Sequence, residues 1–165
     1  MTGVREILGV DIGGVIIERK PEGDDTAFFS ARYLETPEVA GAIDAIAQLA
    51  KGRFAGRVHL VSKCGETVET HTREWLEHHE FAKRTGLNPE RMHFCRTRPE
   101  KAPIAKRLSI THFIDDRLEV LGYLQNVPNR ILFRPDEMEI SGKDALLEFV
   151  TRVEGWAEVL ALLPR

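Results

Sequence analysis

Five polar side chains that can act on a phosphate group lie at or near the ends of short apolar runs. Asp11 ends EILGVD, Ser62 ends VHLVS, and Asp115 and Asp116 end THFIDD, while Lys101 lies in RPEKAPIAK between the last two runs. Because Mg²⁺ prefers oxygen ligands, Asp11 and one or both of the paired aspartates can hold this cation. Ser62 can hydrogen-bond phosphoryl oxygens, and Lys101 can neutralise their charge. Asp11 can then attack phosphorus and form an aspartyl phosphate.

Neighbouring groups can add to phosphate binding. Gly13 and Gly14 let the chain turn tightly after Asp11 and expose its amides beside the carboxylate. Lys63 can reach an anion from its position next to Ser62, and the helix expected to follow presents its N-terminus to the same region. The predicted phosphate-binding residues are Gly14, Ser62, Lys63 and Lys101.

Each of these side chains also has a purely structural interpretation. Asp11 can be a turn residue before the two glycines, and the paired aspartates can cap and flank the helix expected near residue 118. Ser62 can cap the helix that follows it, a role compatible with phosphate binding because both use the same helix end. Lys63 and Lys106 are alternatives to Lys101 for neutralising a phosphate.

The elements that must position these residues alternate between short β-rich runs and longer helical stretches. The expected strands are residues 6–11, 58–62, 92–96, 111–116 and 130–134. The expected helices are residues 37–51, 66–85, 103–108, 118–125, 143–150 and 154–163. Thr36 before Pro37 is the expected N-cap of the first helix, and Gly86 is expected to end the second.

This alternation predicts a three-layer α/β fold, a doubly wound Rossmann-like parallel sheet with helices on both faces. We expect one domain over residues 1–165, in which residues 17–36, with their proline, glycine and acidic pair, form an extended connection. Ligands of such sheets bind outside the carboxyl ends of the strands, where strand order reverses. The polar residues named above lie at these strand ends.

The composition excludes several classes of protein. With 42% hydrophobic and 30% charged residues the chain is expected to be globular and soluble, and its net charge of -3 gives no general affinity for nucleic acid. No apolar run approaches the roughly 20 residues of a membrane helix, and charges interrupt the N-terminal stretch where a signal peptide would be apolar. Two cysteines are too few for a disulfide scaffold, which favours a cytoplasmic protein.

The ordered motifs VDIGGVI, HLVSKCG, the lysine of RPEKAPIAK and HFIDDR, which span residues 7–117, resemble those of the haloacid dehalogenase superfamily. Most members of that superfamily are Mg²⁺-dependent phosphohydrolases. The resemblance implies a sheet of strand order 5-4-1-2-3 with minimal or no cap domain, and a small phosphorylated substrate. It implies Asp11 as the nucleophile, Ser62 and Lys101 as phosphate-contacting residues, and Asp115, Asp116 and the Gly13 carbonyl as further Mg²⁺ ligands beside Asp11.

The sequence departs from the family pattern at Gly13. Phosphatases of the family carry a second aspartate there, which protonates the leaving group and then activates water. Losing a general acid and base typically costs about 10² to 10⁴ in rate. Glu18, Asp24 and Asp25 lie in the extended connection, where family members build a flap, and are candidate substitutes.

Two functions therefore compete. The first is phosphoryl hydrolysis or transfer through Asp11, and the second is a regulatory protein that binds Mg²⁺ and phosphate without efficient turnover. A sugar-kinase phosphate loop also resembles GVDIGGV, but Val15 replaces its threonine and the chain is short for two lobes. A receiver domain places its acidic pair after the first strand, whereas this pair follows the fourth expected strand.

Overall fold

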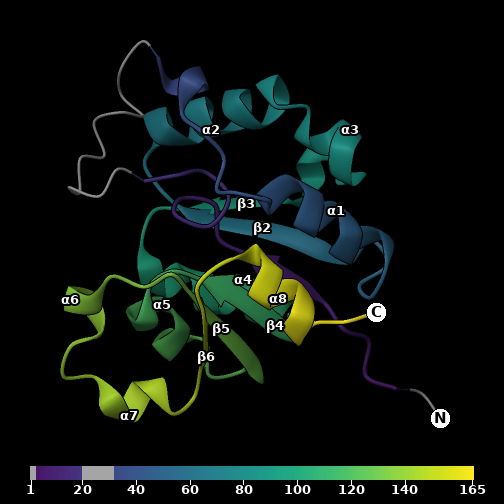
Figure 1. Ribbon diagram of the computed structural model, residues 1–165. Coiled ribbons are helices and arrows are strands. Elements are labelled where there is room, and N and C mark those ends of the chain that lie inside the picture. The colour runs from purple at the N-terminus through teal and green to yellow at the C-terminus, as the bar shows by residue number, and fades with distance from the viewer. Residues whose placement is uncertain (1–2, 20–31) are drawn as a thin grey trace.

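A parallel β-sheet forms the centre of the structure, a computed structural model that describes residues 3–19 and 32–165. Its strands are β1 (Leu8–Val10), β2 (Val58–Lys63), β3 (Met92–Cys95), β4 (His112–Asp115), β5 (Asn129–Phe133) and β6 (Thr151–Val153). Their order is β3-β2-β1-β4-β5-β6, with every neighbouring pair parallel (Figure 1). Because β2 and β4 flank β1, strand order reverses at β1, which is where ligands of such sheets bind.

Four helices among the described residues cover one face of the sheet. They are α1 (Ala42–Lys51), α2 (Glu66–His78), α3 (Phe81–Thr85) and α8 (Trp156–Leu162). Their apolar residues pack in one cluster with Leu8 and Val10 of β1 and with Leu60 of β2. In α1 the buried positions recur at helical spacing, so burial of one apolar stripe holds this helix against the sheet.

The other face is covered by α4 (Lys101–Arg107), α5 (Leu118–Tyr123), α6 (Glu137–Ile140) and α7 (Asp144–Leu147). Val61 and Phe113 point into this second cluster, whereas their strand neighbours Leu60 and Ile114 point into the first, as the period of two in a strand requires. At Gly9 a Cβ would lie 2.6 Å from the Phe113 ring, so glycine is needed for this close approach. The predicted three-layer arrangement is confirmed.

The predicted sheet was too small by one strand. Residues 143–150 were expected to be helical, but within them only α7 (Asp144–Leu147) is a helix. The next residues, Thr151–Val153, form β6 beside β5. A run of three residues is too short to show the alternation by which a strand is recognised. The short helix α6 was also not predicted.

The first helix begins later than expected, at Ala42 after Gly41, whose φ is 77°. Residues 37–39 instead pair with the loop after β1. The Glu18 amide donates to the Pro37 carbonyl at 2.9 Å, and the Val39 amide donates to the Ile16 carbonyl at 2.7 Å. The prediction of Thr36 as an N-cap is therefore wrong, and this residue follows a 3₁₀ helix, Tyr33–Glu35.

The expected helix over residues 66–85 is interrupted at His79 and Glu80, and it forms α2 and α3. Glu80 has a φ of 55°, a left-handed conformation that breaks the helical path. Gly86, with a φ of 80°, ends α3 as predicted. Further 3₁₀ helices are Pro89–Arg91 and Arg98–Glu100, and the latter leads directly into α4, which begins at Lys101 rather than at residue 103.

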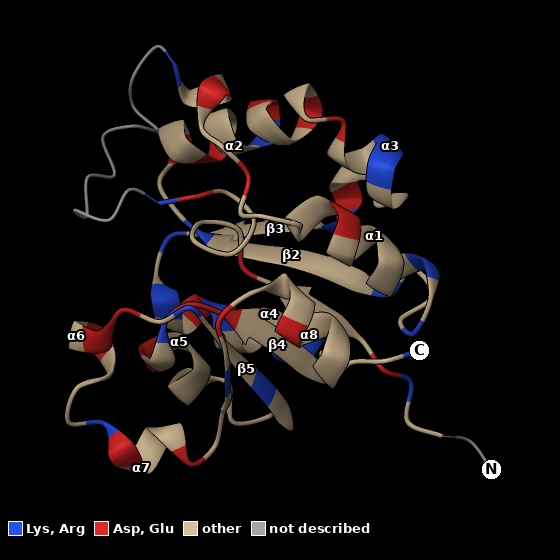
Figure 2. Cartoon of the chain, in the orientation of Figure 1, with Lys and Arg blue, Asp and Glu red and all other residues tan. Residues whose placement is uncertain are grey.

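Charged residues of both signs are interspersed over the helices in the view of Figure 2. Among the helices of the described residues, none combines the length and the apolar character that crossing a membrane requires. Residues 20–31, which hold most of the predicted extended connection together with Asp24 and Asp25, lie outside the described residues.

Candidate functional site

The register of β1 and β4 brings two of the predicted aspartates side by side. Val10 lies opposite Ile114, so Asp11 and Asp115 follow at the same level of the sheet. The Asp11 amide donates to the Ile114 carbonyl at 2.9 Å, which continues the pairing to the end of the strands. Both carboxyl groups are buried, with Asp115 wholly inaccessible and Asp11 4% exposed.

Lys101 connects these two carboxylates. Its Nζ lies 3.0 Å from Asp11 Oδ1 and 2.8 Å from Asp115 Oδ2, and the side chain is 3% exposed. Glu100 accepts hydrogen bonds from the Thr97 amide at 2.9 Å and hydroxyl at 2.7 Å, which fixes the start of α4. Burial opposes the Lys101 charge, but the two carboxylates outweigh it and raise its pKa. Of the three lysines considered, Lys101 is the one bonded to the aspartates.

Asp116 completes a cluster of three carboxyl groups. One oxygen from each of Asp11, Asp115 and Asp116 lies within 4.8 Å of the other two. Burial, with the neighbouring carboxylates Asp11 and Asp115, raises the pKa of Asp116 to about 8, and burial also raises the pKa of Asp115. Asp116 Oδ1 is buried and has no hydrogen-bond partner among the described residues. The cluster thus holds more negative charge, and one more acceptor oxygen, than Lys101 alone can satisfy.

The loop after β1 folds back tightly over this cluster. The amide of Gly14 donates to the Ile17 carbonyl at 2.8 Å, and the Ile16 amide donates to the Ile12 carbonyl at 2.8 Å. Gly14 has a φ of +82°, and a Cβ there would lie 2.4 Å from Asp116 Oδ2, so this position requires glycine on both counts. The Gly14 amide is thus already engaged within the loop, and the predicted contact of Gly14 with phosphate remains a prediction.

The same loop brings a residue to the site that the sequence did not indicate. Arg19 lies where a side chain at position 13 would project, because a Cβ on Gly13 would be 3.2 Å from Arg19 Nη2 and 3.3 Å from Nε. Arg19 Nη1 is 3.5 Å from Asp116 Oδ2. No motif or spacing marks Arg19, since its position depends on the path of an irregular loop.

Ser62 and Lys63 lie at the end of β2, on the other side of β1. Leu60 pairs with Val10, so Ser62 is level with Ile12, one residue beyond Asp11. Ser62 is 7% exposed, and Lys63, the last residue of the strand, is exposed. Both stand at the carboxyl edge of the sheet, and their contacts with phosphate remain predictions.

One candidate for the missing acid is engaged elsewhere. Glu18 Oε1 lies 3.1 Å from Arg134 Nη1, directly after β5, and this pair is partly exposed. Asp24 and Asp25 lie outside the described residues.

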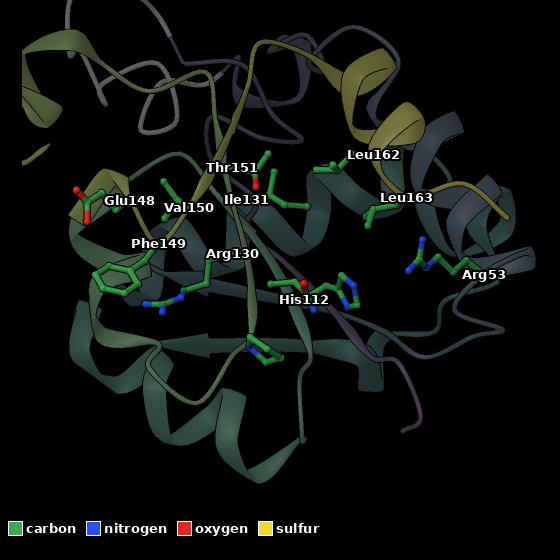
Figure 3. A pocket seen from close by; sticks show the side chains of 12 residues that line it. Arg53, His112, Arg130, Ile131, Glu148, Phe149, Val150, Thr151, Leu162 and Leu163 are labelled. Carbon is green, nitrogen blue, oxygen red and sulfur yellow. The ribbon is translucent and has the colours of Figure 1, made fainter. Parts of the chain in front are cut away.

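A cavity of about 270 Å³ lies at the opposite, amino-terminal edge of the sheet, beside the starts of β4, β5 and β6 (Figure 3). Its walls include Arg53, His112, Arg130 and Phe149. Arg53 is bonded to Glu6 through two contacts of 2.9 Å. None of the predicted site residues lines this cavity.

The chain is a doubly wound α/β protein, and its fold is similar to that of known haloacid dehalogenase-like hydrolases. Two solved structures show this likeness over nearly the whole chain. A D,D-heptose 1,7-bisphosphate phosphatase from Burkholderia thailandensis is 18% identical, with a TM-score of 0.58 over 97% of this chain and 99% of that one. A protein described as a haloacid dehalogenase-like hydrolase from Burkholderia xenovorans is 10% identical, with a TM-score of 0.63 over 96% of both chains.

No known family profile and no curated protein matches the sequence. At these identities the likeness shows the fold alone, and a shared fold does not determine the reaction.

Proposed function

We propose that the protein is a Mg²⁺-dependent phosphohydrolase or phosphotransferase that acts through an aspartyl phosphate on Asp11. The observation that carries this proposal is the buried Asp11–Lys101–Asp115 arrangement with Asp116 beside it. Burying charged groups is costly, so a cluster of this kind at the ligand-binding edge of an α/β sheet favours a functional role. The proposed substrate is a small phosphorylated molecule, and the proposed location is the cytoplasm.

The donor set fits a hard divalent cation. Three carboxyl groups offer oxygens within 4.8 Å of one another, and the buried Asp116 Oδ1 has no partner among the described residues. The proposed ligands are Asp11, Asp115 and Asp116 together with the Gly13 carbonyl. Bound Mg²⁺ would offset the charge of these carboxylates and of the phosphoryl oxygens, as oxygen-ligated magnesium does in phosphoryl transfer.

The residues of the chain have separate proposed roles in the reaction. An Asp11 carboxylate oxygen attacks phosphorus, the bond from phosphorus to the leaving oxygen breaks, and the phosphoryl group passes to Asp11. Lys101 holds Asp11 in place through its 3.0 Å contact and supplies positive charge to the phosphoryl group. The proposed role of Ser62 and Lys63, at the end of the neighbouring strand β2, is to donate hydrogen bonds to phosphoryl oxygens.

A second candidate function is a protein that binds Mg²⁺ and phosphate without efficient turnover. Gly13 favours it, because glycine offers no side chain to protonate a leaving group or to activate water. Arg19 occupies the space beside it and, as a guanidinium, does not act as a proton donor at neutral pH.

The test is incubation with Mg²⁺ and p-nitrophenyl phosphate, following phosphate release and the intact mass of the protein together. We expect an Asp11-dependent reaction that Asp11→Asn abolishes and that Asp144→Asn, an exposed aspartate at the start of α7, leaves unchanged. A phosphoprotein that accumulates would locate the slow step at Asp11 dephosphorylation. Release that persists in Asp11→Asn would contradict the proposed mechanism, and binding of Mg²⁺ and phosphate with neither signal would favour the second function.

A further inference from the structure

The cavity at the amino-terminal edge of the sheet lies between elements that are far apart in the sequence. It is bounded by the starts of β4, β5 and β6 and by the end of α8, where Leu162 and Leu163 lie (Figure 3). Its volume, about 270 Å³, is close to the lower end of the range for small-molecule sites, roughly 300 Å³. The cavity is therefore a candidate site for a small organic ligand.

Half of the residues that line the cavity are apolar. They are Pro128, Ile131, Phe149, Val150, Leu162 and Leu163. Phe149 and Leu162 are 61% and 41% exposed. An apolar molecule in the cavity would shield both side chains from water, and burial of apolar surface is a favourable contribution to binding.

Arg130 brings a positive charge to one end of this apolar wall. Its Nη1 donates to the Leu121 carbonyl at 3.1 Å, and its guanidinium lies 5.6 Å from the centre of the Phe149 ring. Its buried Nε has no hydrogen-bond partner among the described residues. A buried donor without an acceptor is costly, and Nε and Nη2 form the two-donor edge with which a guanidinium binds a carboxylate. This edge of Arg130 therefore favours a carboxylate ligand.

Among the described residues that line the cavity, Arg130 is the arginine without an ion-pair partner. Arg53 is bonded to Glu6 through two contacts of 2.9 Å. Burial lowers the pKa of His112, so this side chain is uncharged at neutral pH. The Glu148 side chain is exposed and points away from Arg130 in Figure 3. One positive charge among apolar walls suits a ligand with a single negative charge, because burying a second one there would be costly.

We propose that the cavity binds a small carboxylate with an apolar body. The carboxylate oxygens accept hydrogen bonds from Nε and Nη2 of Arg130, and the apolar body packs along the wall that includes Leu162 and Leu163. No covalent bond forms or breaks. The aspartates and the lysine of the carboxyl edge do not line this cavity, so the inference is independent of the proposed reaction at Asp11.

The first experiment uses the unmodified protein and three carboxylate probes, benzoate, phenylacetate and hexanoate, with benzamide as a neutral probe of the same shape as benzoate. Binding is followed by two-dimensional NMR of the isotopically labelled protein. We expect saturable shifts of the backbone amides of residues 129–131 and 149–151, and none at residues 11–14, 115 and 116. Benzamide should bind at least about tenfold more weakly than benzoate, because hydrogen bonds to a charged acceptor are stronger than those to a neutral one.

Variants test the roles of the charge and of the apolar wall separately. Arg130→Gln should weaken benzoate binding by about 10- to 100-fold, and Arg130→Lys should restore part of the affinity, since lysine keeps the charge but not the two-donor edge. Leu162→Ala should weaken hexanoate binding by several-fold. Arg107→Gln, at the exposed end of α4 and outside the cavity, is the matched control. Asp11→Asn should bind each probe as the unmodified protein does.

Three results would overturn the proposal. Equal affinity for benzoate and benzamide would contradict the carboxylate contact with Arg130. Saturable shifts confined to residues 11–14, 115 and 116 would place the probes at the carboxyl edge instead. Absence of saturable binding of all three carboxylates at tens of millimolar would exclude the site, since a ligand of this size binds a formed site in that range or more tightly. The shifts measured on the unmodified protein decide the matter even where Arg130→Gln does not fold.

Discussion

The two edges of the sheet handle charge in opposite ways. At the carboxyl edge, Lys101 and two aspartates are bonded to one another with side chains at most 6% exposed. At the amino edge, beside the cavity, Arg53 and Glu6 form a pair with side chains 26% and 35% exposed. Water can hydrate Arg53 and Glu6 when their pair is broken, but it has little access to the three groups at the carboxyl edge. A buried cluster therefore has to balance its own charge, and this one does so incompletely.

The two edges also differ in which kind of buried polar atom lacks a hydrogen-bond partner. At the carboxyl edge the buried atom without a partner among the described residues is an acceptor, Asp116 Oδ1. At the amino edge it is a donor, Arg130 Nε, whose guanidinium also donates to the Leu121 carbonyl at 3.1 Å and lies over the Phe149 ring. The first edge thus favours a cation and the second does not. Three changes test this contrast.

The largest expected effect comes from removing the central cation. Lys101→Met leaves two buried carboxylates without a counter-charge, which should lower the free energy of unfolding by about 3 to 5 kcal/mol without divalent cations. Arg53→Met at the amino edge should cost less than about 1 kcal/mol, since its pair with Glu6 is partly solvated. Urea unfolding of both variants at neutral pH measures the difference. Equal losses would show that the two edges do not differ as described.

A medium effect, with a pH dependence, is expected at Asp116. Its pKa rises from 3.8 to about 8 on folding, so the native state keeps a proton that the unfolded chain releases. The native state is therefore most favoured below about pH 4, and this advantage is lost progressively as pH rises from about 4 to about 8. Without divalent cations, Asp116→Asn should therefore be more stable than the unmodified protein at about pH 9, by about 2 to 4 kcal/mol.

Mg²⁺ should reduce or reverse this difference, because the proposed Mg²⁺ site includes the Asp116 carboxylate, which the asparagine amide does not replace. Thermal unfolding at acid and alkaline pH, in chelator and in Mg²⁺, measures both parts. A difference between the two proteins that does not change with pH would contradict the buried, proton-holding state of Asp116.

The smallest expected effect separates backbone strain from contact with the cluster. Gly14 and Gly56 have nearly equal φ values, +82° and +81°, but a Cβ at Gly14 would meet Asp116 Oδ2 at 2.4 Å, whereas nothing lies within 4 Å at Gly56. Both alanine variants should lose about 1 kcal/mol from the left-handed conformation. Gly14→Ala should lose about 1 kcal/mol more and should weaken Mg²⁺ binding. Chemical denaturation and cation titration of the pair check this.

Much of the site could be predicted because strand ends are visible in a sequence. The apolar runs before Asp11, Ser62 and Asp115 mark buried strands, and parallel strands bring their carboxyl ends to one edge. Lys101 was a candidate because it precedes the fourth expected strand, but Lys63 and Lys106 were open alternatives, and only the structure shows its contacts with Asp11 and Asp115. The sequence also predicted that Asp116 lies near the cluster. It could not show that one Asp116 oxygen lacks a hydrogen-bond partner, because that depends on atomic positions rather than on the order of residues along the chain.

The remaining features depend on non-local pairing. β6 forms because Val153 and its neighbours pair with the edge strand β5. The late start of α1 follows from pairing between residues 37–39 and the loop after β1. Arg19 reaches the space above Gly13 through the same loop. Neither secondary-structure propensity nor hydrophobic periodicity predicts such contacts. The sequence therefore showed that Gly13 replaces an aspartate, but it did not show that Arg19 lies beside Gly13.

The loop that carries Gly13 and Gly14 is also bonded to the far end of the chain. The indole of Trp156, at the start of α8, donates to the Val15 carbonyl at 2.8 Å across a sequence separation of 141 residues. As the chain leaves the ribosome, the loop is made 141 residues before this hydrogen-bond partner. The nascent protein therefore cannot complete this corner of the site until Trp156 has been made.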